Sequence, residues 1–477
     1  GLSGNATGLY ASRSIDIQSN VTIGGSDDYN ELILASAGGI ISVTDDGTTS
    51  IEADAMGIYA NTMEAGHVLD TGRIVAIAGS GTTELVDPAY AAGSGPTEGV
   101  LRIYSGLYDQ FSEADYVAIA GATAIQTVGQ VSTGSGGLLY LNTPQLTGSA
   151  YSAVVDGDTV SRQSANFSAA SIWIDNSGTK AASDATDTSG SMTFTASYDE
   201  AYEEMGLDTG EVLVTGAVTL AAIDQVDIVA QQDVVLAGEG SLTTDGDLTL
   251  SAGRVTAGAV YNGEDYQSAD FEVATAGLLT IQTLEGQTAG TGQTPGGALS
   301  FKADTIVHSG TIDNFAGGIS LAAENGLYLT AGSEIIANGG ILEYTIAEET
   351  VYQAYAAGAV KLSSGGTLEI QGATTDDEGN AIAAAIIDVS NSATDKPDDL
   401  DAETWAGWLD DGYLDAGSLT IAAKQSATVI QGTLLGGAGA QYQDTSGQVV
   451  KARGGDFDLT ALSVDFSALN STLSAGG

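Results

Sequence analysis

The chain repeats one short pattern of polar and apolar positions, in which a glycine is followed by two apolar residues two positions apart. Five copies lie between residues 277 and 362, and their glycines are 20, 20, 23 and 18 residues apart. These five copies are 277–281, 297–301, 317–321, 340–344 and 358–362, and further copies are 39–43, 99–103, 137–141, 190–194, 210–214, 246–250, 417–421 and 455–459. Because the side chains of a strand alternate between its two faces, each copy predicts a short strand with one face buried.

The spacing of these strands predicts how they assemble. Strands that recur about every twenty residues stack on one another, which makes the chain a solenoid. Inside it, Leu278 or Leu279 is expected to lie above residues such as Leu299 and Ile319, in ladders of like side chains. Parallel strands joined by crossovers are right-handed in nearly all proteins. The expected fold is therefore all-β, a right-handed parallel β-helix (β-solenoid) of roughly 20 coils, on the order of 100 Å long.

The pattern continues along the chain without a linker, so we expect one elongated domain over residues 1–477. The sequence does not start with a methionine or a signal-like stretch, and the pattern still runs at its end. We therefore interpret it as a fragment, or a processed product, of a longer polypeptide. Longer spacings predict loop or short-helix insertions at 388–415, with smaller ones near 88–96, 198–206 and 346–357. Insertions in solenoids emerge on one face, which is often the binding face.

The insertion at 388–415 has the most distinctive composition. It is acidic, lacks period-2 alternation and contains two of the three tryptophans of the chain. Asp399 or Asp401 can cap a short helix in which Trp405, Trp408 and Leu409 share one face. We therefore expect a short helix here, outside the stacked strands.

The composition indicates a narrow core without covalent cross-links. Apolar residues make up 43% of the chain but aromatic residues only 6%, whereas a thick globular core normally uses more aromatic side chains. Cysteine is absent, which excludes disulfides, thiolate metal sites and a cysteine nucleophile. No apolar run reaches 18 residues, so no transmembrane segment is expected.

The formal net charge is −50, from 62 acidic and 12 basic residues. Such a surface favours solubility, although its self-repulsion costs stability unless cations screen it. The basic residues are scattered, as at Lys302, Lys361 and Lys424. Binding to nucleic acid needs clustered Lys and Arg that neutralise phosphates, so the charge argues against nucleic acid as a partner. It argues against anionic membranes for the same reason.

Two strands, 246–252 and 417–423, have the form Gly-x-Leu-x-Ile/Leu-x-Ala. This form resembles the repeats of filamentous haemagglutinin-type exoproteins, which are large bacterial surface or secreted proteins, typically exported by two-partner secretion, with a right-handed parallel β-helix shaft. The secretion domain of that family carries Asn-Pro-Asn motifs, and this sequence has none. The resemblance therefore implies the shaft or a distal region of an extracellular adhesin or surface filament, a structural protein rather than an enzyme.

The main alternative is a polysaccharide-active enzyme, since parallel β-helices also include hydrolases and lyases. A hydrolase needs a general acid beside a second carboxylate, and the insertion offers the acids Asp398, Asp399, Asp401, Glu403, Asp410 and Asp411 beside tryptophans that can stack on sugar rings. A lyase of this architecture usually needs a basic residue, and only Lys396 lies in this stretch. His67 and His308, the two histidines, are expected at the surface or in turns. We assign no catalytic or cofactor-binding residue.

Calcium is the one cofactor that the acidic turns suggest, because Ca²⁺ binds several carboxylate and carbonyl oxygens. The candidate turns are 156–158, 245–247, 376–378 and 410–412. The sequence contains neither an EF-hand loop nor a calcium-binding nonapeptide array. Diffuse screening by cations is the alternative, so the metal ligands stay unassigned.

Two kinds of partner remain open. Cell-surface glycans or proteins are candidate ligands, and Tyr104, Tyr140 and Tyr328 are candidate contacts, although we expect them to be ordinary residues of the ladders. A third hypothesis is a self-assembling fibre subunit, because the open edge strands at the two ends of a solenoid can recruit further strands and associate end to end.

Overall fold

The structure is a computed structural model, and it describes residues between 5 and 464. The described segments are 5–11, 14–17, 21–23, 30–36, 40–43, 51–53, 55–59, 62–65, 69–71, 73–78, 83–86, 100–104, 116–121, 124–133, 136–148, 151–155, 158–162, 164–176, 190–198, 209–261, 265–346, 349–376, 378–443 and 446–464. The predicted insertion near 88–96 lies outside these segments, as does nearly all of the one at 198–206.

Strands dominate the described residues, and helix α2 (Ala402–Asp410) is the one helix among them. The strands up to β24 are β1 (Asn5–Ala11), β2 (Ser14–Ile17), β3 (Val21–Ile23), β4 (Asn30–Ser36), β5 (Ile40–Val43), β6 (Ile51–Ala53), β7 (Ala55–Tyr59), β8 (Thr62–Ala65), β9 (Leu69–Thr71), β10 (Arg73–Ala78), β11 (Thr83–Val86), β12 (Val100–Tyr104), β13 (Tyr116–Gly121), β14 (Ala124–Ser132), β15 (Leu138–Asn142), β16 (Gln145–Gly148), β17 (Tyr151–Val155), β18 (Asp158–Arg162), β19 (Ser164–Ala169), β20 (Ser171–Asn176), β21 (Ser191–Ala196), β22 (Glu211–Ala221), β23 (Gln225–Ala230) and β24 (Asp233–Thr244). The later strands are β25 (Asp247–Ser251), β26 (Arg254–Gly258), β27 (Val260–Tyr261), β28 (Tyr266–Gln267), β29 (Asp270–Thr275), β30 (Leu278–Gln282), β31 (Ala298–Ser309), β32 (Thr311–Asp313), β33 (Gly318–Leu329), β34 (Glu334–Ile336), β35 (Gly340–Ile346), β36 (Glu349–Tyr355), β37 (Ala359–Ser364), β38 (Thr367–Ile370), β39 (Thr374–Thr375), β40 (Ala381–Ile382), β41 (Ile386–Asp388), β42 (Ser418–Ile430), β43 (Thr433–Leu435), β44 (Gln441–Gln443), β45 (Val449–Lys451) and β46 (Asp456–Val464).

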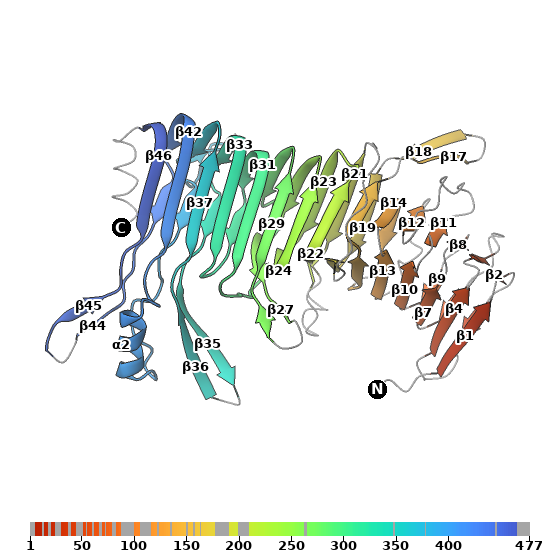
Figure 1. Ribbon diagram of the computed structural model, residues 1–477, viewed down its shortest axis with the longest axis horizontal. Helices are drawn as coiled ribbons and strands as arrows, with labels where there is room; N and C mark the ends of the chain where they lie inside the picture. Colours follow the sequence, from red (N-terminus) through yellow and green to blue (C-terminus); the bar gives the residue numbers. More distant parts are fainter. Residues whose placement is uncertain are drawn as a thin grey trace. The chain divides into compact units, whose positions relative to one another are not determined.

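Most of these strands belong to one large parallel sheet (Figure 1). Strands distant in sequence pair in parallel, as β1 with β4 and β33 with β37. Five hairpins are antiparallel instead: β17–β18, β27–β28, β35–β36, β39–β40 and β44–β45. The prediction of an all-β chain built on parallel strands is therefore confirmed.

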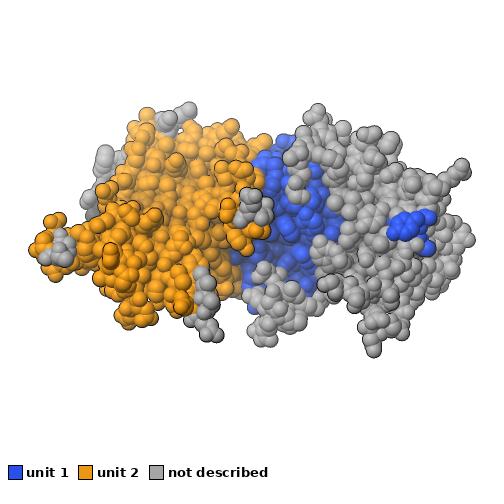
Figure 2. All heavy atoms as spheres, turned by 60° about the horizontal axis from the view of Figure 1, so that its bottom comes forward, with its two compact units in different colours: residues 1–234, 241–249 blue, residues 235–240, 250–477 orange. Residues whose placement is uncertain are grey.

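The chain forms two compact units (Figure 2). Unit 1 contains residues 1–234 and 241–249, and unit 2 contains residues 235–240 and 250–477.

In unit 2 the strands fall into three columns, which the chain visits in a fixed order. The first column contains β29, the first part of β31, the first part of β33, β37, the first part of β42, and β46. The second contains β30, the remainders of β31 and β33, β38 and the remainder of β42. The third contains β26, β32, β34, β41 and β43.

Each column aligns apolar side chains in register. The first column carries the buried ladder Phe271, Leu299, Ile319, Val360 and Leu419, and the third carries Val255, Ile312, Ile335, Ile387 and Leu434. Leu299 therefore pairs with Ile319, as predicted. Leu279 does not join them, because β30 lies in the second column, where Leu279 pairs with Ile306. Leu278 faces away from the core and is 36% exposed.

The glycines that begin the first-column strands lie where neighbouring turns touch. A Cβ atom added to Gly358 would stand 1.7 Å from the carbonyl oxygen of Gly317, and one added to Gly417 would stand 1.7 Å from that of Gly358. Glycine is required here because it lets two backbones approach without a side chain between them. The repeated glycine of the sequence therefore marks a contact between stacked turns.

Unit 1 has a core of the same kind. The strands β13, β15, β20 and β22 align Ile119, Leu141, Ile174 and Val214, all fully buried. In β19 and β21 the rings of Phe167 and Phe194 stack with centroids 4.9 Å apart. Parallel pairing in register explains both features, because it places like residues directly over one another.

The predicted insertion near 346–357 is a hairpin arm. Its strands β35 and β36 pair antiparallel from Gly340 with Tyr355 to Ile346 with Glu349. The repeat copy at 340–344 is thus the first strand of this arm, and the expectation that it stacks like the other four copies is wrong. The copy at 340–344 has the same local pattern as the others, but it pairs with β36 and not with a strand of the first column.

Candidate functional site

Four excursions leave unit 2 between a third-column strand and the next first-column strand. They are the hairpins β27–β28, β35–β36 and β44–β45 and the α2 segment (389–417) between β41 and β42. Figure 1 shows all four on the same side of unit 2. We call them the corner arms. They share a side because each begins at the same turn of the repeat, whereas β39–β40 leaves between the second and third columns.

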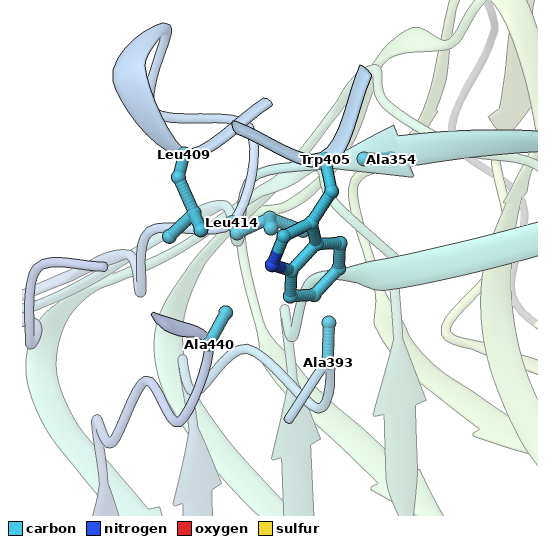
Figure 3. Packing of buried hydrophobic residues seen from close by; sticks show 6 residues of the cluster. All are labelled: Ala354, Ala393, Trp405, Leu409, Leu414 and Ala440. Atoms are coloured by element: carbon cyan, nitrogen blue, oxygen red, sulfur yellow. The ribbon is translucent and has the colours of Figure 1, made fainter. Parts of the chain in front are cut away.

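Three of the corner arms share a small apolar core, which we call the arm cluster (Figure 3). It consists of the buried residues Ala354, Ala393, Trp405, Leu409, Leu414 and Ala440, with Ile341, Leu400, Trp408, Tyr442 and Ala452 packed against them. The Nε1–H of Trp405 donates a hydrogen bond of 3.3 Å to the carbonyl oxygen of Gln441 in β44. The arms therefore support one another and hold one arrangement.

Helix α2 begins where the sequence predicted a cap. The carboxylate of Asp401 accepts hydrogen bonds from the backbone N–H of Thr404 at 2.8 Å and from its hydroxyl at 2.7 Å. These bonds favour the charged form and lower the pKa of Asp401. Asp401 rather than Asp399 is therefore the cap, and Trp405 and Leu409 form the buried face of the helix.

Two of the groups predicted for a glycosidase site have structural roles instead, the Asp401 carboxylate and the Trp405 ring. A general acid needs a raised pKa, and that of Asp401 is lowered by its capping bonds. Trp405 is only 4% exposed, so its ring faces the arm cluster and cannot stack on a sugar. Asp410 instead accepts a hydrogen bond of 3.5 Å from the hydroxyl of Tyr442. The side chain of Lys396 binds the carbonyl oxygens of Pro397 and Leu400 and supports the loop before the helix.

The β35–β36 arm brings further acids to α2. Desolvation, followed by the negative charges of Glu343, Asp399 and Asp398, raises the pKa of Tyr352. At the base of the arm, burial raises the pKa of Tyr355, whose hydroxyl lies 3.3 Å from that of Tyr344. Large apolar side chains remain exposed on the arms: Tyr261, Tyr266, Tyr344, Val351, Tyr413 and Val449. The arms thus present aromatic and apolar groups within an acidic surrounding.

In one of the candidate calcium turns the carboxylate oxygens already serve the fold. In the turn at 376–378, the Asp376 carboxylate accepts hydrogen bonds from the backbone N–H groups of Glu378 and Asn380 and from the Asn380 amide, and these bonds lower its pKa. Across the described residues, no three acidic or histidine side chains converge as a metal set. Part of the turn at 156–158 lies outside the described segments. Calcium binding stays a prediction.

The expectation that His308 lies at the surface or in a turn is wrong. His308 is fully buried in β31, in the ladder between Ile281 and Leu329. Its Nε2 lies 3.0 Å from the carbonyl oxygen of Glu334, and Nδ1 has no hydrogen-bond partner. Burial disfavours the charged ring and lowers its pKa to about 4, although the backbone hydrogen bond partly opposes this. His67 lies outside the described segments.

Unit 1 contains a cluster of polar and aromatic side chains, of which the sequence analysis singled out only Tyr140. On the outward face of β15, β20 and β22, Tyr140 pairs in register with Trp173, and Asn142 pairs with Asp175, which pairs with Thr215. We call these five residues the aromatic shelf. Tyr140 was a candidate contact, whereas Trp173 and Asp175 were missed. The available signal was the alternation of Ser171–Asn176, which places a tryptophan and an aspartate at positions that face away from the core.

The two other candidate tyrosines give no such group. Tyr328 lies between the buried Leu327 and Leu329, pairs with Val307 and Glu369, and is partly exposed. It is an ordinary outward ladder residue, as expected. Tyr104 ends β12, and its side chain lies outside what the structure describes.

Comparisons with known protein families, curated proteins and solved structures gave no match. The resemblance to filamentous haemagglutinin-type exoproteins therefore rests on the strand repeat alone. Among the described residues, no helix is both long enough and apolar enough to cross a membrane.

Proposed function

We propose that this protein is a right-handed parallel β-helix that forms the shaft of a large bacterial surface adhesin or filament, outside the cell and without enzymatic activity. The observation that carries the proposal is the build of unit 2, where three parallel columns of strands recur in a fixed order and four of the excursions leave at one corner. Such a repeat extends a chain in one direction and presents a series of side contacts.

The columns suit a structural element. Each inner strand of a column pairs with a strand on both sides, so its backbone groups are satisfied by its own neighbours. The interior consists mainly of apolar ladders such as Val360 above Ile319, with His308 buried in one of them. Stiffness along the stack and a largely apolar core are what a shaft requires.

The corner arms suit a contact surface. The core that three of them share fixes the positions of these three before any partner binds, and pre-organised surfaces lose less entropy on binding. Exposed aromatic side chains such as Tyr344 and Tyr413 supply large contact areas. Cell-surface glycans or proteins are the partners that an exported protein of this kind meets.

The test measures retention of protein-coated beads on immobilised cell-surface glycans and matrix proteins. We expect retention that falls when Tyr344→Ser and Val351→Ser are combined on the β35–β36 arm. Val429→Ser is the matched control, because Val429 is a similarly exposed valine in a column strand. Equal retention of both variants would contradict the role of the arms.

Enzymatic activity is tested separately with a panel of polysaccharides. The pure protein is expected to leave them intact. Depolymerisation that disappears in a variant with Asp410→Asn and Asp411→Asn would overturn the proposal in favour of a β-helical hydrolase or lyase.

A further inference from the structure

The aromatic shelf in unit 1 is a solvent-side surface built on three neighbouring strands. The residues on either side of Tyr140 and Trp173 along β15 and β20 are buried core residues, such as Leu141 and Ile172, so the two rings face away from the core. Both rings are partly exposed. Their centroids lie 4.7 Å apart, with 54° between the ring planes. The two faces form an angled apolar surface.

A hydrogen-bond network among β15, β20 and β22 fixes the orientation of both rings. The Nε1–H of Trp173 donates to the hydroxyl of Thr215 at 2.8 Å, and the hydroxyl of Tyr140 donates to the carboxylate of Asp175 at 2.7 Å. Thr215 in turn donates to the other oxygen of Asp175 at 2.6 Å. The amide of Asn142 donates to the Tyr140 hydroxyl at 2.8 Å. Asp175 thus joins the two ring anchors, and each ring keeps one orientation.

This network uses a buried carboxylate on the outward face of a sheet. Asp175 and Thr215 are each 5% exposed. Among the described side chains, the carboxylate of Asp175 is held by two hydroxyls rather than by a basic group. Burying a carboxylate without a cation costs stability. On the neighbouring strand β13, the residue that pairs with Tyr140 is the small Ala118, so pairing of these strands does not itself require a polar network. We infer that this cost in stability is offset by a function that needs the two rings in a fixed orientation.

We propose that the aromatic shelf binds one face of an uncharged sugar ring in a glycan. A pyranose presents C–H groups on one face, which pack on aromatic faces, and hydroxyls at its edge, which need polar neighbours. Here Ser171, Asn142 and Glu211 lie around the rings. An anionic ligand is disfavoured by the net charge of −50. Fixed rings reduce the entropy lost on binding. The inference deepens the adhesive function proposed above and names its partner class.

The test is a neutral-glycan array followed by titration of the best binder into the full chain. Trp173→Ala and Tyr140→Ala are each expected to weaken binding about tenfold or more. Tyr328→Ala is the matched control, because Tyr328 is a partly exposed outward tyrosine on a column strand, and it should leave binding unchanged. Thermal unfolding of each variant shows whether the fold is kept.

A second variant separates anchoring from contact. Asp175→Asn keeps both rings but weakens the acceptor of the Tyr140 and Thr215 hydroxyls, and Thr215 in turn holds Trp173, so binding should fall by less than it does in Trp173→Ala. If Trp173→Ala alters the fold, loss of binding in folded Asp175→Asn still supports the proposal. Binding that is unchanged in folded Trp173→Ala overturns it, and so does binding of an apolar peptide instead of any glycan.

The glycan array and the bead assay together distinguish failure of this proposal from failure of the proposed adhesive function. An empty array together with beads that still adhere to matrix proteins overturns the shelf and leaves the adhesive function standing. An empty array together with beads that adhere to nothing overturns both.

Discussion

Three glycines of the repeat, Gly317, Gly358 and Gly417, are needed for the close approach of neighbouring backbones rather than for unusual backbone angles. They lie one above another at the turn before the first column, where Gly358 faces the carbonyl group of Gly317 and Gly417 faces that of Gly358. The distance between these turns is set by the hydrogen bonds of the flanking strands, such as that from the N–H of Ser418 to the carbonyl oxygen of Gly358. A side chain at this position can be accommodated only if the stacked strands separate.

We therefore expect Gly358→Ala to lower the free energy of unfolding by about 3 kcal/mol, as overpacking of a rigid site does. Equilibrium unfolding in urea measures the change. Gly407→Ala is the control: the same substitution lies in the interior of α2, where the added methyl group meets nothing within 4 Å. It should be neutral or stabilise the helix by up to about 1 kcal/mol.

His308 makes stability depend on pH within a defined range. Its pKa is about 4 in the folded protein and 6.5 when exposed, so the unfolded chain binds the proton more tightly between these values. Stability is therefore complete above about pH 6.5 and falls as the pH drops towards 4, by about 3 kcal/mol in total. The physical reason is that a charged imidazole cannot be solvated inside the ladder.

The variant His308→Leu should remove this part of the pH dependence and should match its aliphatic neighbours Ile281 and Leu329. The measurement is the free energy of unfolding of both proteins at pH 7 and pH 5. The difference between the two proteins isolates the histidine from the many carboxylates. Parallel pH profiles would contradict the prediction.

At the scale of elements, the corner arms show how a repeat tolerates insertions. Val360 pairs with Ile319 and Leu419 although the β35–β36 arm precedes it and the α2 segment follows it. A long excursion leaves the register intact because the chain departs and returns at the same turn. Three of the arms, β35–β36, the α2 segment and β44–β45, pack on one another through the arm cluster.

Trp405→Ala should therefore release the arms without unfolding the columns. The loss of a buried tryptophan costs about 3 kcal/mol or more, and in a satellite core this appears as local opening. Hydrogen exchange is expected to speed up roughly a hundredfold in α2, with the amides of β33 and β37 unchanged. Trp408→Ala, at a partly buried position of the same helix, should have a smaller effect. Equal acceleration throughout unit 2 would show that the arm cluster is not separate.

At the scale of the whole molecule, the charge is the dominant property. With 62 acidic residues against 12 basic ones, most carboxylates have no cationic partner to pair with. Two ion pairs of unit 2 differ in burial. Arg254 and Asp313 form a buried pair at 3.4 Å, and Lys302 and Glu272 form an exposed one. The remaining repulsion between like charges must be screened by dissolved cations.

Thermal stability should accordingly rise by several degrees between low and near-molar sodium chloride, because salt screens exposed charges. The measurement is the unfolding midpoint by circular dichroism, with sucrose as a control that adds no ions. Calcium at millimolar concentration, compared with magnesium at equal ionic strength, tests the acidic turns. Equal midpoints in the two salts would indicate screening alone, and a higher midpoint in calcium would indicate a specific site.

Several features could be predicted from local sequence, and others could not. A cap at Asp399 or Asp401 and the apolar face of α2 follow from residues within one helix, so they could be predicted, and the structure then selected Asp401. The burial of His308 could not, because it depends on the ladder neighbours Ile281 and Leu329, which lie more than twenty residues away on either side. The sequence showed that acidic residues gather at 398–411, but it could not show that Tyr352 and Tyr442, from other arms, lie near them.

The sequence by itself determined the strands and their stacking, because alternation of apolar residues and the recurrence of glycine are properties of short stretches. Only the tertiary structure decided which copy joins which column. The copy at 340–344 has the pattern of a column strand but becomes part of a hairpin, and Leu279 pairs with Ile306 rather than with Leu299. It also decided that Trp405 is buried while Trp173 forms part of an outward surface. Both outcomes depend on partners that parallel pairing of strands brings together from distant positions in the sequence.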